Sequence, residues 1–120
     1  MRKLKTIQTQ EKLNDVYATD QPGPGNACHS YVIMDRSIDS EKLAEISFQC
    51  GPRKDESSIA GVIDSDLLEI VRDRLISFQT GDYANDYNKA ALEHVELALK
   101  ALNARVEDRI NRNVLGTNNK

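Results

Sequence analysis

The chain has 120 residues, 19 acidic against 16 basic side chains, and a formal net charge of −3 at pH 7. This length predicts one domain, and the acidic balance excludes a nucleic-acid binder with a wide basic surface. No apolar run approaches the roughly 18 residues of a membrane helix, and no leader peptide is evident. We therefore expect a cytoplasmic protein.

The first 60 residues predict a small antiparallel sheet. Residues 1–26 are polar and form an edge strand or an arm, ending in the Pro/Gly-rich loop Gln21–Asn26. Within residues 27–60, the β-forming run Tyr31–Ile33 predicts a strand. The returning strand alternates apolar with polar residues, at Ile46, Phe48 and Cys50. Together these segments predict a β-hairpin region.

The two cysteines, Cys28 and Cys50, lack the spacing of a metal site or a redox motif. A disulfide between them is an alternative if two strands bring them together. In a reducing cytoplasm we expect free thiols instead.

Residues 62–112 change to a helical period. Apolar residues at 67, 68, 71, 75 and 78 predict a first helix, with Asp64 as its N-cap and Gly81 as its stop. A second helix begins near Asn85 or Asp86 and ends near Arg112. Its apolar stripe contains Ala91, Val95, Ala98, Leu102, Val106 and Ile110. The short connection predicts an antiparallel hairpin.

The fold class is therefore α+β, a small N-terminal antiparallel β-sheet followed by a C-terminal antiparallel helical hairpin. We expect a single signal-binding domain over residues 1–120, with residues 113–120 as a tail. The second helix is about 28 residues and roughly 42 Å long. Because its far end has nothing from its own chain to pack on, we expect a homo-oligomer, either a dimer or an assembly of dimers.

Arginines gather near the end of the second helix. Arg105, Arg109 and Arg112 lie at i, i+4 and i+7, on one stripe. Cations at a helix C-terminus complement the macrodipole, but arginine at all three positions also favours bidentate binding of phosphate or carboxylate. Gly116 and Thr117 add a backbone amide and a hydroxyl. Both interpretations stay open.

Aromatic and amide groups gather at the hairpin turn, namely Phe78, Tyr83, Tyr87 and Asn88. An aromatic face beside an amide can stack on a base and hydrogen-bond its edge. Alternatively, Phe78 seals the hairpin core and the tyrosines shield the turn.

A catalytic or metal site is not apparent. The chain has two histidines and no Ser/His/Asp grouping, P-loop or metal-ligand spacing. His29 follows Cys28, but neighbours in a strand point to opposite faces. We therefore expect no enzyme, no cofactor and no metal.

Short motifs run in order from the Pro/Gly loop to the tail. They are Pro24-Gly25-Asn26, Tyr31, Phe48-Gln49, Gly51-Pro52, Gly61, Asp66–Ile70, Arg74-Leu75, Phe78-Gln79, Gly81, Tyr83, Asn88, Asn103-Ala104-Arg105, Arg109, Arg112, Val114 and Gly116-Thr117. In this order and spacing, over roughly residues 22–117, the chain resembles the Thoeris anti-defence 1 family of phage proteins. More distantly, it resembles the anti-CBASS hairpin proteins.

The resemblance implies a protein that binds a cyclic ADP-ribose isomer, glycocyclic ADP-ribose, and holds it without cleaving it. This nucleotide is the signal of bacterial Thoeris immunity, so the setting is the infected host. By position, Phe78 and Asn88 match the family's nucleoside-contacting pair, and Arg105 and Arg109 match its phosphate-contacting arginines. Some relatives also bind cyclic di- or trinucleotides of CBASS at a second site.

The tail departs from the family pattern, because Asn113 and Leu115 stand where the family favours Gly and Glu. Two other functions stay open: an enzyme that hydrolyses the same signal, and a helical interaction or structural module with no small ligand.

Overall fold

The computed structural model describes residues 1–37 and 39–120. The chain divides into two compact units, Met1–Val62 and Ile63–Lys120, which we call the sheet unit and the hairpin unit. In the described residues, no helix has both the length and the apolar character to cross a membrane. A four-stranded antiparallel sheet precedes two helices, which confirms the predicted α+β fold.

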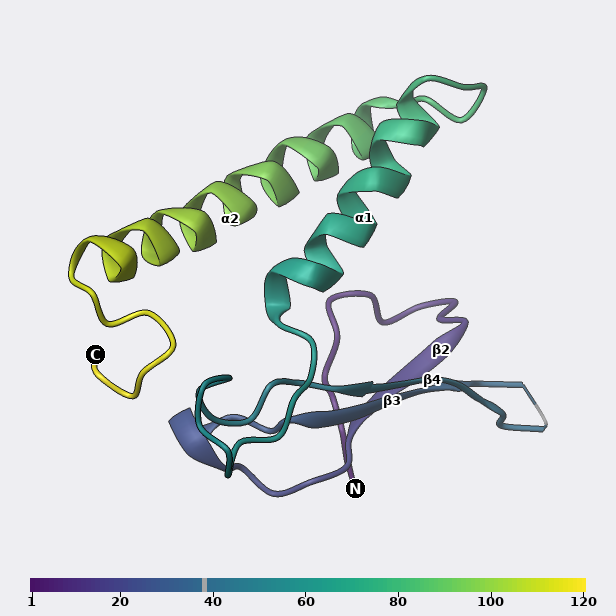
Figure 1. The fold of residues 1–120 in the computed structure, drawn as a ribbon. Helices are drawn as coiled ribbons and strands as arrows, with labels where there is room; N and C mark the ends of the chain where they lie inside the picture. The colour runs from purple at the N-terminus through teal and green to yellow at the C-terminus, as the bar shows by residue number, and fades with distance from the viewer. Residues whose placement is uncertain (38) are drawn as a thin grey trace. The chain divides into compact units, whose positions relative to one another are not determined.

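The sheet has the strand order β1-β2-β3-β4, with each strand antiparallel to its neighbour (Figure 1). The strands are β1 (Arg2–Lys3), β2 (Asn14–Ala18), β3 (Ser30–Asp35) and β4 (Lys42–Ser47). The polar N-terminal segment therefore supplies two strands, and the predicted pair is β3 and β4. The returning strand ends earlier than predicted, because Phe48 and Cys50 form only isolated bridges, to Val62 and Ile59.

The core of the sheet unit is small. Ala18, Cys28 and Val32 are its buried apolar residues among those described. Tyr31 and Phe48 add an edge-to-face pair with ring centroids 5.6 Å apart. Cys28 and Cys50 are both free thiols.

Gly61 allows the end of the sheet unit to approach the strand. A Cβ atom here would lie 2.5 Å from both the carbonyl oxygen of Ser47 and the carbonyl carbon of Phe48. These are backbone atoms that cannot move aside, so only glycine fits. The close approach lets the Gln49 N–H donate to the Val62 carbonyl at 2.8 Å.

The hairpin unit consists of α1 (Asp64–Gln79) and α2 (Asp86–Asn111) (Figure 1). The start of α2 matches the prediction, because the Asn85 side chain accepts the Asn88 N–H at 2.8 Å. The predicted N-cap of α1 is wrong: Asp64 already lies inside the first turn, and Ile63 is the cap residue. The Asp66 carboxylate accepts the Ile63 N–H at 2.9 Å instead.

The predicted apolar stripe of α2 is only partly correct. The half-buried apolar side chains of this helix are Leu92, Val95, Leu99 and Leu102, whereas Ala91 and Ala98 are exposed. The packed face is rotated from the prediction because α1 approaches from the side marked by the Arg72–Glu96 ion pair, with Nε 3.0 Å from Oε2.

The C-terminal part of α2 extends past α1. The Arg72–Glu96 ion pair aligns the two antiparallel helices. From Arg72, α1 extends eight residues back to its start at Asp64, and the same eight residues along α2 from Glu96 end at Ala104. Because α2 continues to Asn111, its last residues lie beyond the start of α1. Val106 still lines a hollow with Ser65 and Glu69 of α1, whereas Ile110 continues the packed face beyond the start of α1. Ile110 is 52% exposed.

Candidate functional site

The hairpin turn brings four of the predicted site residues to one end of the unit. Phe78 lies in the last turn of α1, Tyr83 in the connection, and Tyr87 and Asn88 in the first turn of α2. Tyr83 and Tyr87 are 76% and 89% exposed, and Phe78 is 36% exposed. Neither tyrosine covers the hairpin core, so both rings are open to a ligand.

Arg74 belongs to this cluster and was missed in the sequence. Its guanidinium carbon lies 5.4 Å from the centroid of the Phe78 ring, a cation–π contact. The i, i+4 spacing on α1 was the available signal. Arg74 places a cation beside the aromatic ring that is the candidate base-stacking surface.

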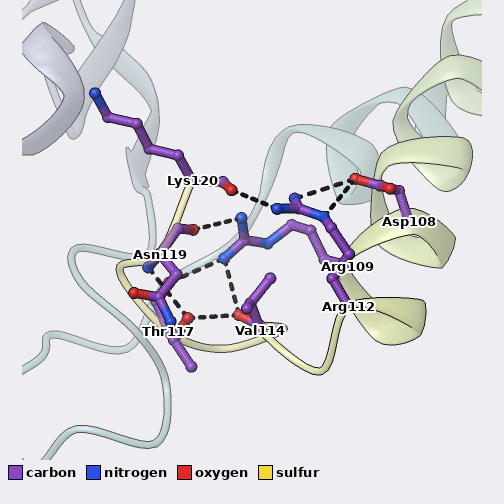
Figure 2. Close-up of polar contacts among 7 residues, drawn as sticks. All are labelled: Asp108, Arg109, Arg112, Val114, Thr117, Asn119 and Lys120. Atoms are coloured by element: carbon purple, nitrogen blue, oxygen red, sulfur yellow. Dashed lines mark hydrogen bonds and ion pairs between the residues drawn. The ribbon is translucent and has the colours of Figure 1, made fainter.

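Arg109 is buried by its own chain at the other end of α2. Only 6% of it is exposed. Its Nη1 donates to the Asn119 carbonyl at 2.7 Å, and its Nη2 donates to the carbonyls of Val114 and Thr117 at 2.9 and 3.1 Å (Figure 2). The guanidinium thus closes the C-terminal tail into a loop around itself. Carbonyl dipoles, and no carboxylate of the described residues, face this cation.

Arg112 has a different environment from Arg109. Its Nη2 lies 3.1 Å from Asp108 Oδ2, and its Nη1 donates to the Lys120 carbonyl at 2.6 Å (Figure 2). Arg112 is also the C-cap residue of α2. These contacts tie it to the helix end and the tail.

Arg105 and Arg112 are both exposed. Within the described part of the chain, Arg105 differs in that its guanidinium forms no hydrogen bond or ion pair, whereas Arg112 is paired with Asp108. Arg105 lies on the overhanging part of α2, beyond the start of α1. Its donors are therefore available to an anion.

The tail keeps a conformation suited to glycine at two positions. Gly116 has φ 78° and Asn113 has φ 58°, in the left-handed region. After glycine, asparagine is among the residues that enter this region most readily. Asn113 can therefore hold this left-handed turn without a glycine. Thr117 does not present its hydroxyl proton outward, because Oγ1 donates to the Val114 carbonyl at 2.6 Å.

The predicted site residues form two clusters that one chain does not bring together. Asn88 and Arg105 lie 17 residues apart on the uninterrupted helix α2, which corresponds to about 25 Å at 1.5 Å per residue. Phe78 lies with Asn88, and Gly116 and Thr117 lie with the arginines.

Among the described residues, no hydrogen bond joins the Cys28 thiol to the His29 imidazole. The Cys28 thiol donates to the Asp20 carbonyl at 3.4 Å, and the His29 N–H donates to the Asp20 carboxylate at 2.9 Å. The described residues contain no group of three His, Cys, Asp or Glu side chains arranged for a metal ion.

Comparison with known proteins adds two findings. Residues 40–107 match the family described as the Acb2/Tad1 hairpin domain. A protein of Bacillus phage SBSphiJ7 named Thoeris anti-defense 1 is 39% identical over 79 residues, which cover 66% of this chain and 55% of the relative. The chain thus spans about half the length of this relative. The family match includes the turn cluster and Arg105 and ends before Arg109.

Proposed function

The chain belongs to the Acb2/Tad1 hairpin-domain family, and we propose that it is a phage anti-defence protein that sequesters a nucleotide signal of bacterial Thoeris immunity. The ligand of this proposal is a cyclic ADP-ribose isomer, glycocyclic ADP-ribose, which the protein binds without cleaving. The name of the phage relative supports the anti-defence role. The division of the candidate residues between the two ends of α2 supports the binding mode.

That division is the observation on which the proposal depends. The turn cluster offers an aromatic ring and an amide, which suit a nucleoside, whereas Arg105 offers unpaired donors that suit a pyrophosphate. About 25 Å of helix separates Asn88 from Arg105. Two protomers with antiparallel α2 helices would bring the turn of one chain to the arginine of the other, so the site is shared between subunits.

In this site the adenine stacks on the ring of Phe78, and the guanidinium of Arg74 lies over the same Phe78 ring. The Asn88 amide hydrogen-bonds the nucleoside, and Tyr83 and Tyr87 wall the pocket. The Phe78, Asn88 and Arg74 side chains offer no nucleophile or general base to a neighbouring phosphate. Binding without turnover is the chemistry that such a set of side chains supports.

The arginine end binds the phosphates. Arg105 contacts them directly. Arg109 holds Val114, Thr117 and Asn119 through its hydrogen bonds, and it reaches a phosphate only by exchanging one of these carbonyls for the ligand. In this proposal the tail held by Arg109 contributes the amide of Gly116 and the side chain of Thr117 to the phosphate site, and Arg112 supports the helix end.

Thermal unfolding with a panel of cyclic nucleotides tests the proposal, because a ligand that binds only the folded state raises the apparent stability. We expect glycocyclic ADP-ribose to raise the Tm, whereas a purely structural module shows no shift. Base–aromatic stacking is worth about 1–3 kcal/mol. Phe78→Leu, which keeps apolar volume and removes the ring, should therefore weaken binding about tenfold.

Asn88→Ala should also weaken binding. Phe48→Leu is the matched control, because Phe48 is the chain's other phenylalanine and packs on Tyr31 in the sheet unit. Wild-type affinity in both Phe78→Leu and Asn88→Ala, with the protein folded, would place the base elsewhere.

A further inference from the structure

The sheet unit contains a hollow of about 400 Å³ with a marked positive charge. It lies beside the connection between β1 and β2 and the residue that follows β3. Its lining includes four cationic side chains and one carboxylate: Lys3, Lys5, Lys12, Arg36 and Asp15. Four positive charges less one negative charge leave a surplus of +3 in a protein whose net charge is −3.

Asp15 is the acidic centre of the hollow and is shared among three cations. Its Oδ1 lies 3.6 Å from Lys3 Nζ and 3.5 Å from Lys12 Nζ, and its Oδ2 lies 3.5 Å from Arg36 Nε. The Asp15 side chain is 14% exposed, and Oδ1 has no hydrogen-bond partner among the described residues. The cations are thus held near the carboxylate without being hydrogen-bonded to it.

Three cations are more than the neutralisation of one Asp15 carboxylate requires. One well-placed cation can pair with a half-buried carboxylate, and each further cation adds repulsion from the others. Lys3 and Arg36 are 52% and 44% exposed at their side chains, so a ligand can reach their donors. The hollow is also lined by Thr6, Gln8 and Thr9. Gln8 fixes the loop by donating to the carbonyls of Gln10 and Glu11.

We propose that this hollow binds a small phosphate-bearing molecule with at least two negative charges, of the size of pyrophosphate or a nucleoside diphosphate. The volume lies within the range of small-molecule sites. Clustered Lys and Arg donors provide the charge-assisted hydrogen bonds that phosphate oxygens accept. The hollow lies wholly in residues 3–36, outside the matched range 40–107, and its lining contains no residue of either cluster of the hairpin unit.

NMR titration of the full chain with pyrophosphate at low salt tests this site. We expect saturable shifts of the amides of residues 3–12 and 36, which weaken as salt is added because partly exposed charges are screened. Lys12→Gln and Arg36→Gln should each weaken binding about tenfold. Lys42→Gln is the matched control, because Lys42 lies outside the hollow and pairs with Glu45 at 2.9 Å. It should leave the affinity unchanged.

Asp15→Asn gives the sharpest result, since removing the competing carboxylate should strengthen pyrophosphate binding severalfold. Should that variant unfold, the two Gln variants decide alone. ADP is the second probe. If ADP binds more tightly than pyrophosphate, the hollow recognises a nucleotide; if the two bind equally, it recognises the diphosphate group alone. Unsaturable shifts, or equal losses in Lys42→Gln and Arg36→Gln, would overturn the proposal.

Discussion

At the scale of single residues, three arginines that share one helical stripe have three different environments. Arg109 is buried under the tail, Arg112 pairs with Asp108, and Arg105 is open. The sequence predicts that the three share a stripe, but helical periodicity says nothing of a tail that folds back over one of them. Their separate roles depend on contacts of the C-terminal loop, which spacing does not encode.

Arg105→Ala should weaken binding of glycocyclic ADP-ribose about tenfold or more, because a charge-assisted hydrogen bond is worth about 1.5–3 kcal/mol. Its exposure predicts no loss of folding. Arg112→Ala removes the same charge from a side chain that is already paired and should cost the ligand much less. Calorimetric titration of both variants measures the difference. Unchanged affinity in Arg105→Ala would make this arginine irrelevant to the ligand.

Asp20 gives a pH dependence to the sheet unit. The His29 N–H, and the Ser30 N–H after it, hold the pKa of this carboxylate below its ordinary value of 3.8. A depressed pKa in the folded state stabilises the protein at pH values above the unfolded pKa, and this contribution is lost as the pH falls through the folded pKa. The stability difference between the wild type and Asp20→Asn should therefore be constant near neutrality and shrink below about pH 4.

Urea unfolding at a series of pH values, followed by a probe in the sheet unit, measures this difference. Asp20→Asn removes the charge but keeps an oxygen that can accept hydrogen bonds from the His29 and Ser30 N–H groups. A difference that stays constant down to pH 2 would show that the carboxylate charge does not act through these amides.

At the scale of elements, the sequence predicts the helices and the β3–β4 pair well, but it predicts the packed face of α2 and the capping residue of α1 less well. Asn85 marks the start of α2, and Tyr31–Ile33 lie within β3, because capping and β-propensity act locally. On the packed face of α2, the prediction named Ala91 and Ala98, whereas the next residues, Leu92 and Leu99, are the half-buried ones. At the start of α1, it named Asp64, whereas the carboxylate of Asp66 accepts the backbone N–H of the cap residue. Both errors concern choices between adjacent apolar or acidic residues, which only tertiary packing decides.

The tail is held chiefly by the Arg109 side chain, with one further contact from Arg112 to Lys120. Arg109→Lys keeps the charge but replaces the guanidinium fork that reaches three carbonyls. We expect faster amide exchange over residues 113–120, with α1 unaffected. Any loss of ligand affinity should accompany this change, unlike the loss in Arg105→Ala. Wild-type exchange in the tail would show that Arg109 does not hold it.

At the scale of the whole molecule, the hairpin unit leaves much of its apolar surface open. Among the described residues neither α1 nor α2 contains a fully buried apolar side chain. The exposed apolar side chains of the two helices include Ile70, Leu97, Val106 and Ile110. Val106 also lines a hollow of about 330 Å³ between the helices with Leu99, Leu102 and the polar residues Ser65, Glu69 and Asn103. Exposed apolar surface of this kind is typical of an interaction face. A second copy with antiparallel α2 would cover it and complete the shared ligand site.

Multi-angle light scattering at micromolar concentration measures this assembly. We expect a dimer or a multiple of dimers of the 13.5 kDa chain. Ile110→Asp should shift the protein toward the monomer, because it places a charge on the overhanging part of α2, where a partner would pack. Leu43→Asp, at an exposed apolar residue of the sheet unit, is the control. A monomer at all concentrations would contradict a site shared between subunits.

The most direct test of sequestration is the fate of the bound nucleotide. The protein is saturated with glycocyclic ADP-ribose, freed of excess ligand and held for hours at the host's growth temperature. It is then denatured by heat, and the released nucleotide is identified by chromatography and mass spectrometry. We predict near-complete recovery of the intact cyclic molecule from the wild type and little from Arg105→Ala. Release of linear ADP-ribose from the wild type, increasing with time, would identify an enzyme and contradict sequestration.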